Sequence, residues 1–103
     1  MLAAADLNQR FARKGEVEFK VADHGAMVAQ VTNAQGNGAI ACQGAQVLTW
    51  APAGQAPVVW LSTDARFQAT KSLRGGIPVC WPWFGAHAQD PAKPAHGLSL
   101  IHI

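Results

Sequence analysis

The spacing of apolar residues first indicates a helix at the start of the chain. Ala3, Leu7 and Phe11 recur every four positions, which places them on one face of a helix. Gly15 then supplies a residue type that often follows a helix C-terminus. The pattern therefore predicts a short amphipathic helix within residues 2–13, and we treat residues 1–14 as an N-terminal helical appendage.

From Glu16 onward the apolar period changes from four residues to two. Val17, Phe19 and Val21 alternate with Glu18 and Lys20, so one face of an extended segment is apolar and the other is charged. This alternation predicts the first strand of a half-buried sheet.

More apolar and β-branched runs follow at short intervals. Asn33 to Gly38 is rich in residues that tolerate positive φ, which predicts a hairpin turn, and Pro52 to Gly54 predicts another turn. The strands expected around these turns cover residues 27–32, 39–42, 44–51 and 58–61. This even rhythm predicts an all-β domain built as a meandering antiparallel sheet.

The sequence changes character after Leu61. Residues 62–72 are polar and mixed, whereas the 24 residues from Arg74 to Gly97 carry four Gly, four Pro, two Trp and two His. Loops of this length inside compact domains are usually functional or disordered, and the aromatic content argues against disorder. We therefore expect a shaped loop with a functional role.

Composition narrows the class of protein. The chain has 103 residues and a formal charge of +2, which allows one small globular domain. Its basic residues are spread out, so no nucleic-acid partner is expected. Its apolar runs are far shorter than the ~20 residues of a membrane span, and the start lacks a secretory pattern. We expect a cytoplasmic protein without membrane contact, and a monomer by default.

The two cysteines do not indicate a metal or redox site. Cys42 and Cys80 lack metal-ligand spacing and are too few for a disulfide scaffold, so both are expected to be buried thiols. No metal is expected.

Arg74 and Gly75 are the first candidates for ligand binding. An arginine followed by two glycines offers a planar cation beside backbone that a ligand can approach closely, which suits a phosphate or sugar hydroxyls. The alternative is that the glycines only form a turn and Arg74 pairs with a carboxylate. The residues by themselves leave both interpretations open.

Aromatic residues follow this pair within the same loop. Trp81 and Trp83 alternate across Pro82, so in an extended backbone they face the same side and, with Phe84, form a platform for a sugar ring. A place in the core is the competing interpretation.

Histidines in turns complete the candidate set. His96, within Pro94 to Gly97, is a candidate for proton transfer or hydrogen bonding, because imidazole titrates near neutral pH. His96 and His87 are each open to a second interpretation, a solvated loop histidine without a functional role. His24 is interpreted as a turn residue. The aspartates are isolated, so no carboxylate pair for general acid and base catalysis is identified.

These residues together carry a family resemblance. Two segments resemble the signature of the hexose-6-phosphate mutarotases, or glucose-6-phosphate 1-epimerases, of the aldose 1-epimerase superfamily. They are Arg74-Gly-Gly-Ile-Pro-Val-Cys-Trp-Pro-Trp-Phe-Gly85 and, after it, Pro94-Ala-His-Gly97. The upstream segments 43–52 and 57–62 resemble the early strands of that family. The resemblance covers residues 15–97. It implies an antiparallel β-sandwich of the galactose-mutarotase type, a large supersandwich that is truncated here.

The resemblance also implies an activity. Family members interconvert the α and β anomers of glucose 6-phosphate without a cofactor: a glutamate removes the proton on O1, a histidine protonates the ring oxygen, and the ring opens and recloses. The family's phosphate-binding arginine maps onto Arg74 and its cleft histidine onto His96. We therefore expect Arg74, His96, Gly75 and Trp83 to bind a hexose 6-phosphate as a small-molecule substrate.

The chain departs from the family pattern at its end. The family's catalytic histidine and glutamate occur in later segments, so we expect both to lie beyond this chain and the 103 residues to be inactive alone. The family motif continues as His-Gly-Phe-Ala-Arg, whereas here Leu100 stands at the arginine position. We interpret 15–97 as the N-terminal part of a sandwich domain that exposes strand edges and an apolar face, and 98–103 as a non-native tail.

Two other functions stay open. One is a non-catalytic carbohydrate-binding β-sandwich module, for which the aromatic platform would suffice. The other is a structural β-domain in which the tryptophans belong to the core.

Overall fold

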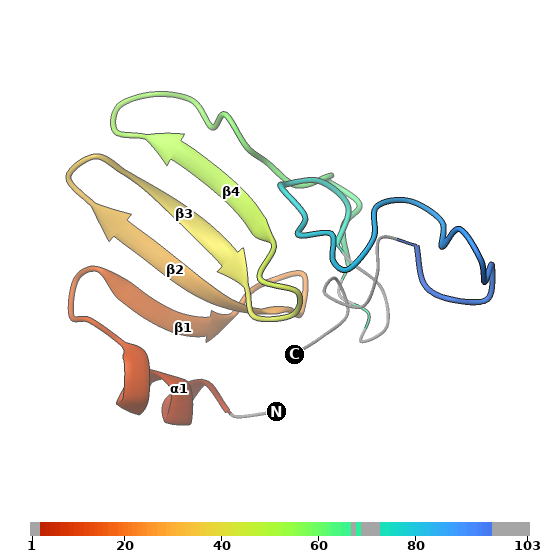
Figure 1. Cartoon of the computed structure of the whole chain (residues 1–103). Helices are drawn as coiled ribbons and strands as arrows, with labels where there is room; N and C mark the ends of the chain where they lie inside the picture. The colour runs from red at the N-terminus through yellow and green to blue at the C-terminus, as the bar shows by residue number, and fades with distance from the viewer. Residues whose placement is uncertain (1–2, 67, 69–72, 96–103) are drawn as a thin grey trace.

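The computed structural model describes residues 3–66, 68 and 73–95. Within this part of the chain one helix precedes four strands: α1 (Ala4–Phe11), β1 (Val17–Val21), β2 (Met27–Asn33), β3 (Gly36–Ala41) and β4 (Val47–Pro52). Each strand pairs antiparallel with its sequence neighbour, so the sheet has the order β1-β2-β3-β4 (Figure 1). The predicted helix and antiparallel all-β meander are confirmed. No helix in the described residues has the length and apolarity needed to cross a membrane.

The helix α1 lies along the outer edge of β1 (Figure 1). Asn8 makes the contact. The Asn8 Nδ2 donates to the carbonyl of Phe19 at 2.8 Å, and the amide of Phe19 donates to the Asn8 Oδ1 at 2.6 Å. The rings of Phe11 and Phe19 pack beside this pair, with centroids 6.4 Å apart. One side chain thus satisfies a backbone donor and a backbone acceptor on an edge strand, so these two groups are not available to pair with another strand.

The hairpin between β2 and β3 is tighter than the sequence suggested. Asn33 already pairs with Gly36, and the Asn33 Oδ1 accepts a hydrogen bond from the Gln35 amide at 2.8 Å. The predicted hairpin is confirmed, although the described positive-φ residues include none between 33 and 38. Gly36 and Gly38 instead leave room for Trp50, since a Cβ at Gly38 would lie 3.1 Å from the indole Cε3.

Two strand predictions needed correction. The strand expected at 44–51 begins only at Val47, because Gly44 and Ala45 turn the chain at positive φ. The strand expected at 58–61 forms isolated bridges only, from Val59 to Trp50 and from Leu61 to Gly75. The apolar run at 58–61 lies beside the sheet, but it contacts its neighbours only through these single bridges.

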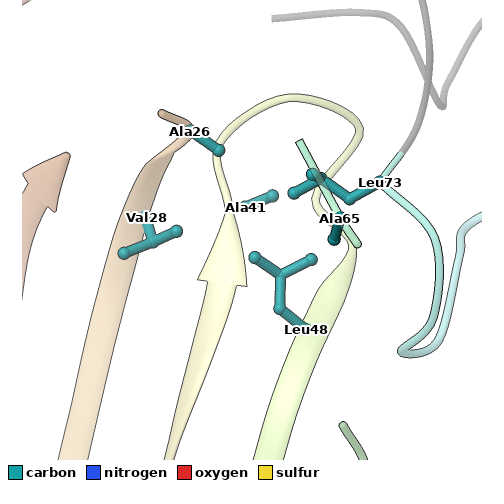
Figure 2. Close-up of a cluster of buried hydrophobic side chains, with 6 residues drawn as sticks. All are labelled: Ala26, Val28, Ala41, Leu48, Ala65 and Leu73. Atoms are coloured by element: carbon teal, nitrogen blue, oxygen red, sulfur yellow. The ribbon is translucent and has the colours of Figure 1, made fainter. Parts of the chain in front are cut away.

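The core lies at one end of the sheet, where strands β2, β3 and β4 meet the later segments (Figure 2). Leu48 and Val28 are its largest fully buried side chains. Leu73 reaches the same cluster from the segment that leads to Arg74. The complete cluster is Ala26, Val28, Ala41, Leu48, Ala65 and Leu73. The cluster therefore joins the end of the sheet to the segment that begins the candidate site.

The opposite face of the sheet is apolar but only half-covered. Val17 pairs with Val31 and Phe19 with Ala29, and directly opposite residues share a face. All four are half-buried, while Val21, next along the same face of β1, is 60% exposed. The exposed apolar face expected of this sheet is present.

Candidate functional site

Arg74 sits on a backbone segment that is tied to the sheet. The preceding Leu73 is buried in the core. The carbonyl of Arg74 accepts a hydrogen bond from the Ser62 amide at 3.0 Å, and the Gly76 amide donates to the carbonyl of Trp60 at 2.9 Å. Ile77 exchanges backbone hydrogen bonds with Val47 at 2.7 and 3.1 Å. The position of Arg74 is thus set by contacts on both sides of it.

The two glycines after Arg74 are required by the geometry. Gly75 has φ of 106° and Gly76 φ of 71°, in the region that side-chain-bearing residues rarely adopt. A Cβ on Gly75 would lie 2.7 Å from the carbonyl oxygen of Trp60, and one on Gly76 would collide with the carbonyl oxygen of Val47. Both glycines thus have a backbone role, because they adopt positive φ and pack closely on neighbouring backbone.

The side chain of Arg74 is exposed and carries an uncompensated charge within the described structure. All six side-chain carboxylates of the chain belong to described residues. Among those residues the one ion pair joins Arg13 to Glu16, at 3.7 Å. No side-chain carboxylate therefore neutralises Arg74, and the alternative that it pairs with one finds no support here. An exposed guanidinium on fixed backbone is well suited to an anionic ligand.

Gln46 supports this segment and was not identified from the sequence. Its side chain is 2% exposed, and its Nε2 donates to the carbonyl of Leu73 at 3.0 Å and to that of Gly75 at 2.7 Å. These carbonyls belong to the residues on either side of Arg74. A glutamine at the start of an apolar strand run was the available signal, but its partners lie almost 30 residues away in the sequence.

A shallow groove lies beside the backbone that follows Arg74. It has a volume of about 420 Å³ and is lined by Val58, Val59, Trp60, Gly75, Gly76 and Ile77. A hollow of about 430 Å³ lies at the other edge of the sheet, beside α1, and is lined by residues such as Lys14 and Glu16. The groove of residues 58–60 and 75–77 has apolar walls, and Arg74 directly precedes its lining residue Gly75 in the chain.

The aromatic residues divide into two environments. Trp83 is packed within its own loop: its indole N–H donates to the carbonyl of Pro94 at 2.9 Å, its ring meets His87 edge-on with centroids 4.5 Å apart, and the Lys93 ammonium lies 5.8 Å from the ring centre. Trp81 and Phe84 are 69% and 82% exposed. Within this loop the exposed aromatic side chains are therefore Trp81 and Phe84, while Trp83 packs against other loop residues.

The described histidines and cysteines have structural surroundings. His87 Nδ1 accepts hydrogen bonds from the amides of Gln89 and Asp90, at 3.2 and 3.0 Å, and His24 Nδ1 accepts one from Ala26 at 3.3 Å, which confirms the turn role of His24. His96 lies outside the described residues. No group of three or more His, Cys, Asp or Glu capable of holding a metal occurs in the described part of the chain.

The two thiols differ slightly from expectation. Cys42 and Cys80 are both free and half-buried rather than fully buried. Burial raises the pKa of the Cys42 thiol, which disfavours the nucleophilic thiolate.

Comparisons with known proteins indicate the family of this chain. A protein from Escherichia coli K12 named "Putative glucose-6-phosphate 1-epimerase" is 48% identical over 69 residues, which is 67% of this chain and 23% of that protein. The protein of the same name from Salmonella typhimurium LT2 is 45% identical over the same length, with the same coverage. The chain thus spans about a quarter of the length of these curated relatives.

A solved structure shows the fold. The crystal structure described as a "putative mutarotase" from Salmonella typhimurium superposes with a TM-score of 0.76 at 37% identity, over 84% of this chain and 29% of the other. The chain accordingly has part of a mutarotase β-sandwich fold. The sequence also matches the family model of aldose 1-epimerase over residues 10–101, nearly its whole length. This chain belongs to the aldose 1-epimerase family.

Proposed function

We propose that this chain carries the phosphate-binding part of a hexose-6-phosphate mutarotase site, with Arg74 as the phosphate ligand. The observation that carries the proposal is the exposed guanidinium of Arg74 on a fixed backbone, with no side-chain carboxylate of the described residues paired to it. Relatives named as glucose-6-phosphate 1-epimerases support a sugar phosphate as the substrate.

The chemistry of the neighbouring residues fits this substrate. The guanidinium fork of Arg74 can donate two parallel hydrogen bonds to phosphate oxygens. Gly75 and Gly76 line the groove with backbone alone, so a sugar ring there would contact main-chain atoms. In this proposal His96 contacts the sugar, and Trp83 contributes by holding its loop together.

Anomer interconversion needs more than this binding site. Ring opening requires a base at O1 and an acid at the ring oxygen, positioned at the same time. We place both groups in segments of the family domain outside these 103 residues, since the matched region is about a quarter of the relatives' length. The chain alone is therefore expected to bind the substrate without turning it over.

Ligand titration tests the binding proposal. Glucose 6-phosphate should shift the backbone NMR signals of Arg74 to Ile77, whereas glucose should shift them much less. Arg74→Ala should weaken glucose 6-phosphate binding by about 10 to 150-fold, the worth of a charge-assisted contact of roughly 1.5 to 3 kcal/mol. Arg74→Lys should recover part of the loss, because it keeps the charge without the fork.

A second arginine supplies the matched control. Arg66 is also exposed, but its guanidinium donates to the carbonyl of Ala65 at 2.8 Å. Arg66→Ala should leave the affinity nearly unchanged. Equal losses from both variants would mean that general positive charge attracts the phosphate, and would refute Arg74 as its ligand.

Polarimetry on α-glucose 6-phosphate tests the placement of the catalytic groups. The chain should not accelerate mutarotation above the buffer rate. A protein-dependent rate that survives repurification would show that the acid and base lie within these residues.

The exposure of Trp81 and Phe84 favours a second candidate, a non-catalytic carbohydrate-binding module. In that case sugar rings stack on the aromatics and phosphate is irrelevant. Glucose and glucose 6-phosphate would then bind equally, and Trp81→Ala would abolish both while Arg74→Ala changed neither.

A further inference from the structure

We propose that Gln46 is the positioning residue for Arg74: its buried amide holds the backbone on both sides of the arginine and so fixes the point and direction at which the arginine side chain leaves the backbone. This inference deepens the proposed function and rests on it for the identity of the ligand. It rests on this chain's own contacts for the mechanism.

The hydrogen bonds of Gln46 are unusually well placed for such a role. A side-chain amide has two N–H bonds on one nitrogen, and here that nitrogen lies 3.0 Å from the Leu73 oxygen and 2.7 Å from the Gly75 oxygen. Arg74 is the residue between these two carbonyls. The glutamine therefore clamps two peptide groups, the one between Leu73 and Arg74 and the one between Gly75 and Gly76.

The turn before β4 keeps Gln46 in place. Gly44 and Ala45 both have positive φ, which turns the chain sharply after β3. The carbonyl of Gln46 then accepts a hydrogen bond from the Ala41 amide at 2.8 Å, and Val47 begins β4. Its side chain thus starts from rigid backbone at the junction of two strands, which makes it a precise support.

Burial makes these bonds strong and their loss costly. The Gln46 side chain is 2% exposed, and hydrogen bonds are stronger in such low-dielectric surroundings than in water. If the amide is replaced, water cannot easily take its place at the Leu73 and Gly75 carbonyls. Those peptide groups would rotate to find new partners and carry Arg74 with them.

The first test is amide hydrogen exchange in the full chain without ligand. Gln46→Met has a similar shape and lacks both donors. The Ser62 amide donates to the Arg74 carbonyl, and the Gly76 amide donates to the Trp60 carbonyl. We expect hydrogen exchange at these two amides to accelerate about five- to tenfold, while exchange in the β2–β3 hairpin stays unchanged. Unchanged exchange at Ser62 and Gly76 would overturn the proposal whether or not phosphate binds.

Gln43 offers a matched control, because it lies with Gln46 in the connection between β3 and β4. It is 7% exposed, and its Nε2 donates to the carbonyl of Gln68 at 3.3 Å rather than to the neighbours of Arg74. Gln43→Met should lower the melting temperature while leaving exchange at Gly76 unchanged. If both variants loosen Gly76 equally, Gln46 has only a general structural role.

The second test is a double-mutant cycle on glucose 6-phosphate binding. Gln46→Met should weaken binding about five- to tenfold in the wild-type chain, but should cause no further loss in the Arg74→Ala background, because Gln46 acts through Arg74. Additive losses would overturn the positioning role. Wild-type binding that does not depend on Arg74 would instead refute the proposed function.

A shorter amide keeps the proposal testable if Gln46→Met does not fold. Gln46→Asn retains both N–H bonds but ends one methylene earlier, so it cannot span both carbonyls. We expect intermediate exchange at Gly76 and intermediate affinity. Wild-type behaviour in both measurements would contradict the proposal.

Discussion

The sheet and the segment that bears Arg74 are held together in different ways. Strands β1 to β4 form a continuous antiparallel ladder in which each strand is secured by many equivalent backbone bonds. Residues 73–77 form no regular strand and depend on a few specific contacts: the Gln46 amide, single backbone bonds and two positive-φ glycines. Stability is therefore distributed across the sheet, whereas the site geometry depends on individual residues.

The core substitution Leu48→Ala should have the largest effect and should disrupt both regions. Leu48 is 1% exposed and packs in the cluster that includes Leu73, so it joins the sheet to the Arg74 segment. We expect a loss of about 3 kcal/mol in the free energy of unfolding, measured by urea denaturation.

Val21→Ala is the control for this change. Val21 is 60% exposed, and its truncation should cost well under about 1 kcal/mol. Similar losses for the two variants would mean that the cluster is not the centre of stability.

Gly76→Ala should disrupt the site while sparing the ladder. The new Cβ meets the backbone oxygen of Val47, which cannot give way as a side chain would, and the φ of 71° is itself unfavourable. We expect a cost of about 2 to 3 kcal/mol, seen as faster exchange of the Ile77 amide.

A second glycine separates the strain of positive φ at position 76 from the steric contact with Val47. Gly54 has φ of 72° but nothing within 4 Å of its Cβ position. Gly54→Ala should therefore cost only about 1 kcal/mol in urea denaturation. If both alanines cost the same, crowding against Val47 contributes nothing.

Asn8→Ala tests a place where the sheet itself depends on one side chain. It removes both hydrogen bonds to the backbone of Phe19, for an expected loss of about 1 to 2 kcal/mol and faster exchange of the Phe19 amide. Gln9→Ala, on the same helix and exposed, should change neither quantity. Unaltered exchange in Asn8→Ala would show that α1 does not protect β1.

The smallest expected effect is a pH dependence from His24. Burial lowers the pKa of this histidine, an effect opposed by the Asp23 carboxylate and reinforced by Arg66. The unfolded state then binds more protons, so the contribution of His24 to stability is complete above its ordinary pKa of about 6.5 and is lost as pH falls below it. Melting temperatures between pH 7.5 and 5.5 should decline less in His24→Gln. An identical decline would assign the effect to other groups.

Local patterns in the sequence determined the helix, the first strands and the motif around Arg74. Four-residue spacing is enough to place Leu7 and Phe11 on one helix face, and alternation from Val17 to Val21 is enough to define β1. Arg74 with its two glycines was likewise recognisable, because a positive-φ turn beside a cation is a property of adjacent residues. These features depend on neighbours in the chain, so the sequence alone carries them.

Tertiary structure decided which residues support those features. Gly36 and Gly38 make room for Trp50, Asn8 binds the edge of β1, and Gln46 reaches across to the backbone around Arg74. Each of these pairs lies more than ten residues apart. Strand register brings the glycines to Trp50, the packing of α1 on β1 brings Asn8 to Phe19, and the turn into β4 places Gln46. A polar or glycine residue inside an apolar pattern signals that some partner exists, but the partner is chosen by the packing of the whole chain.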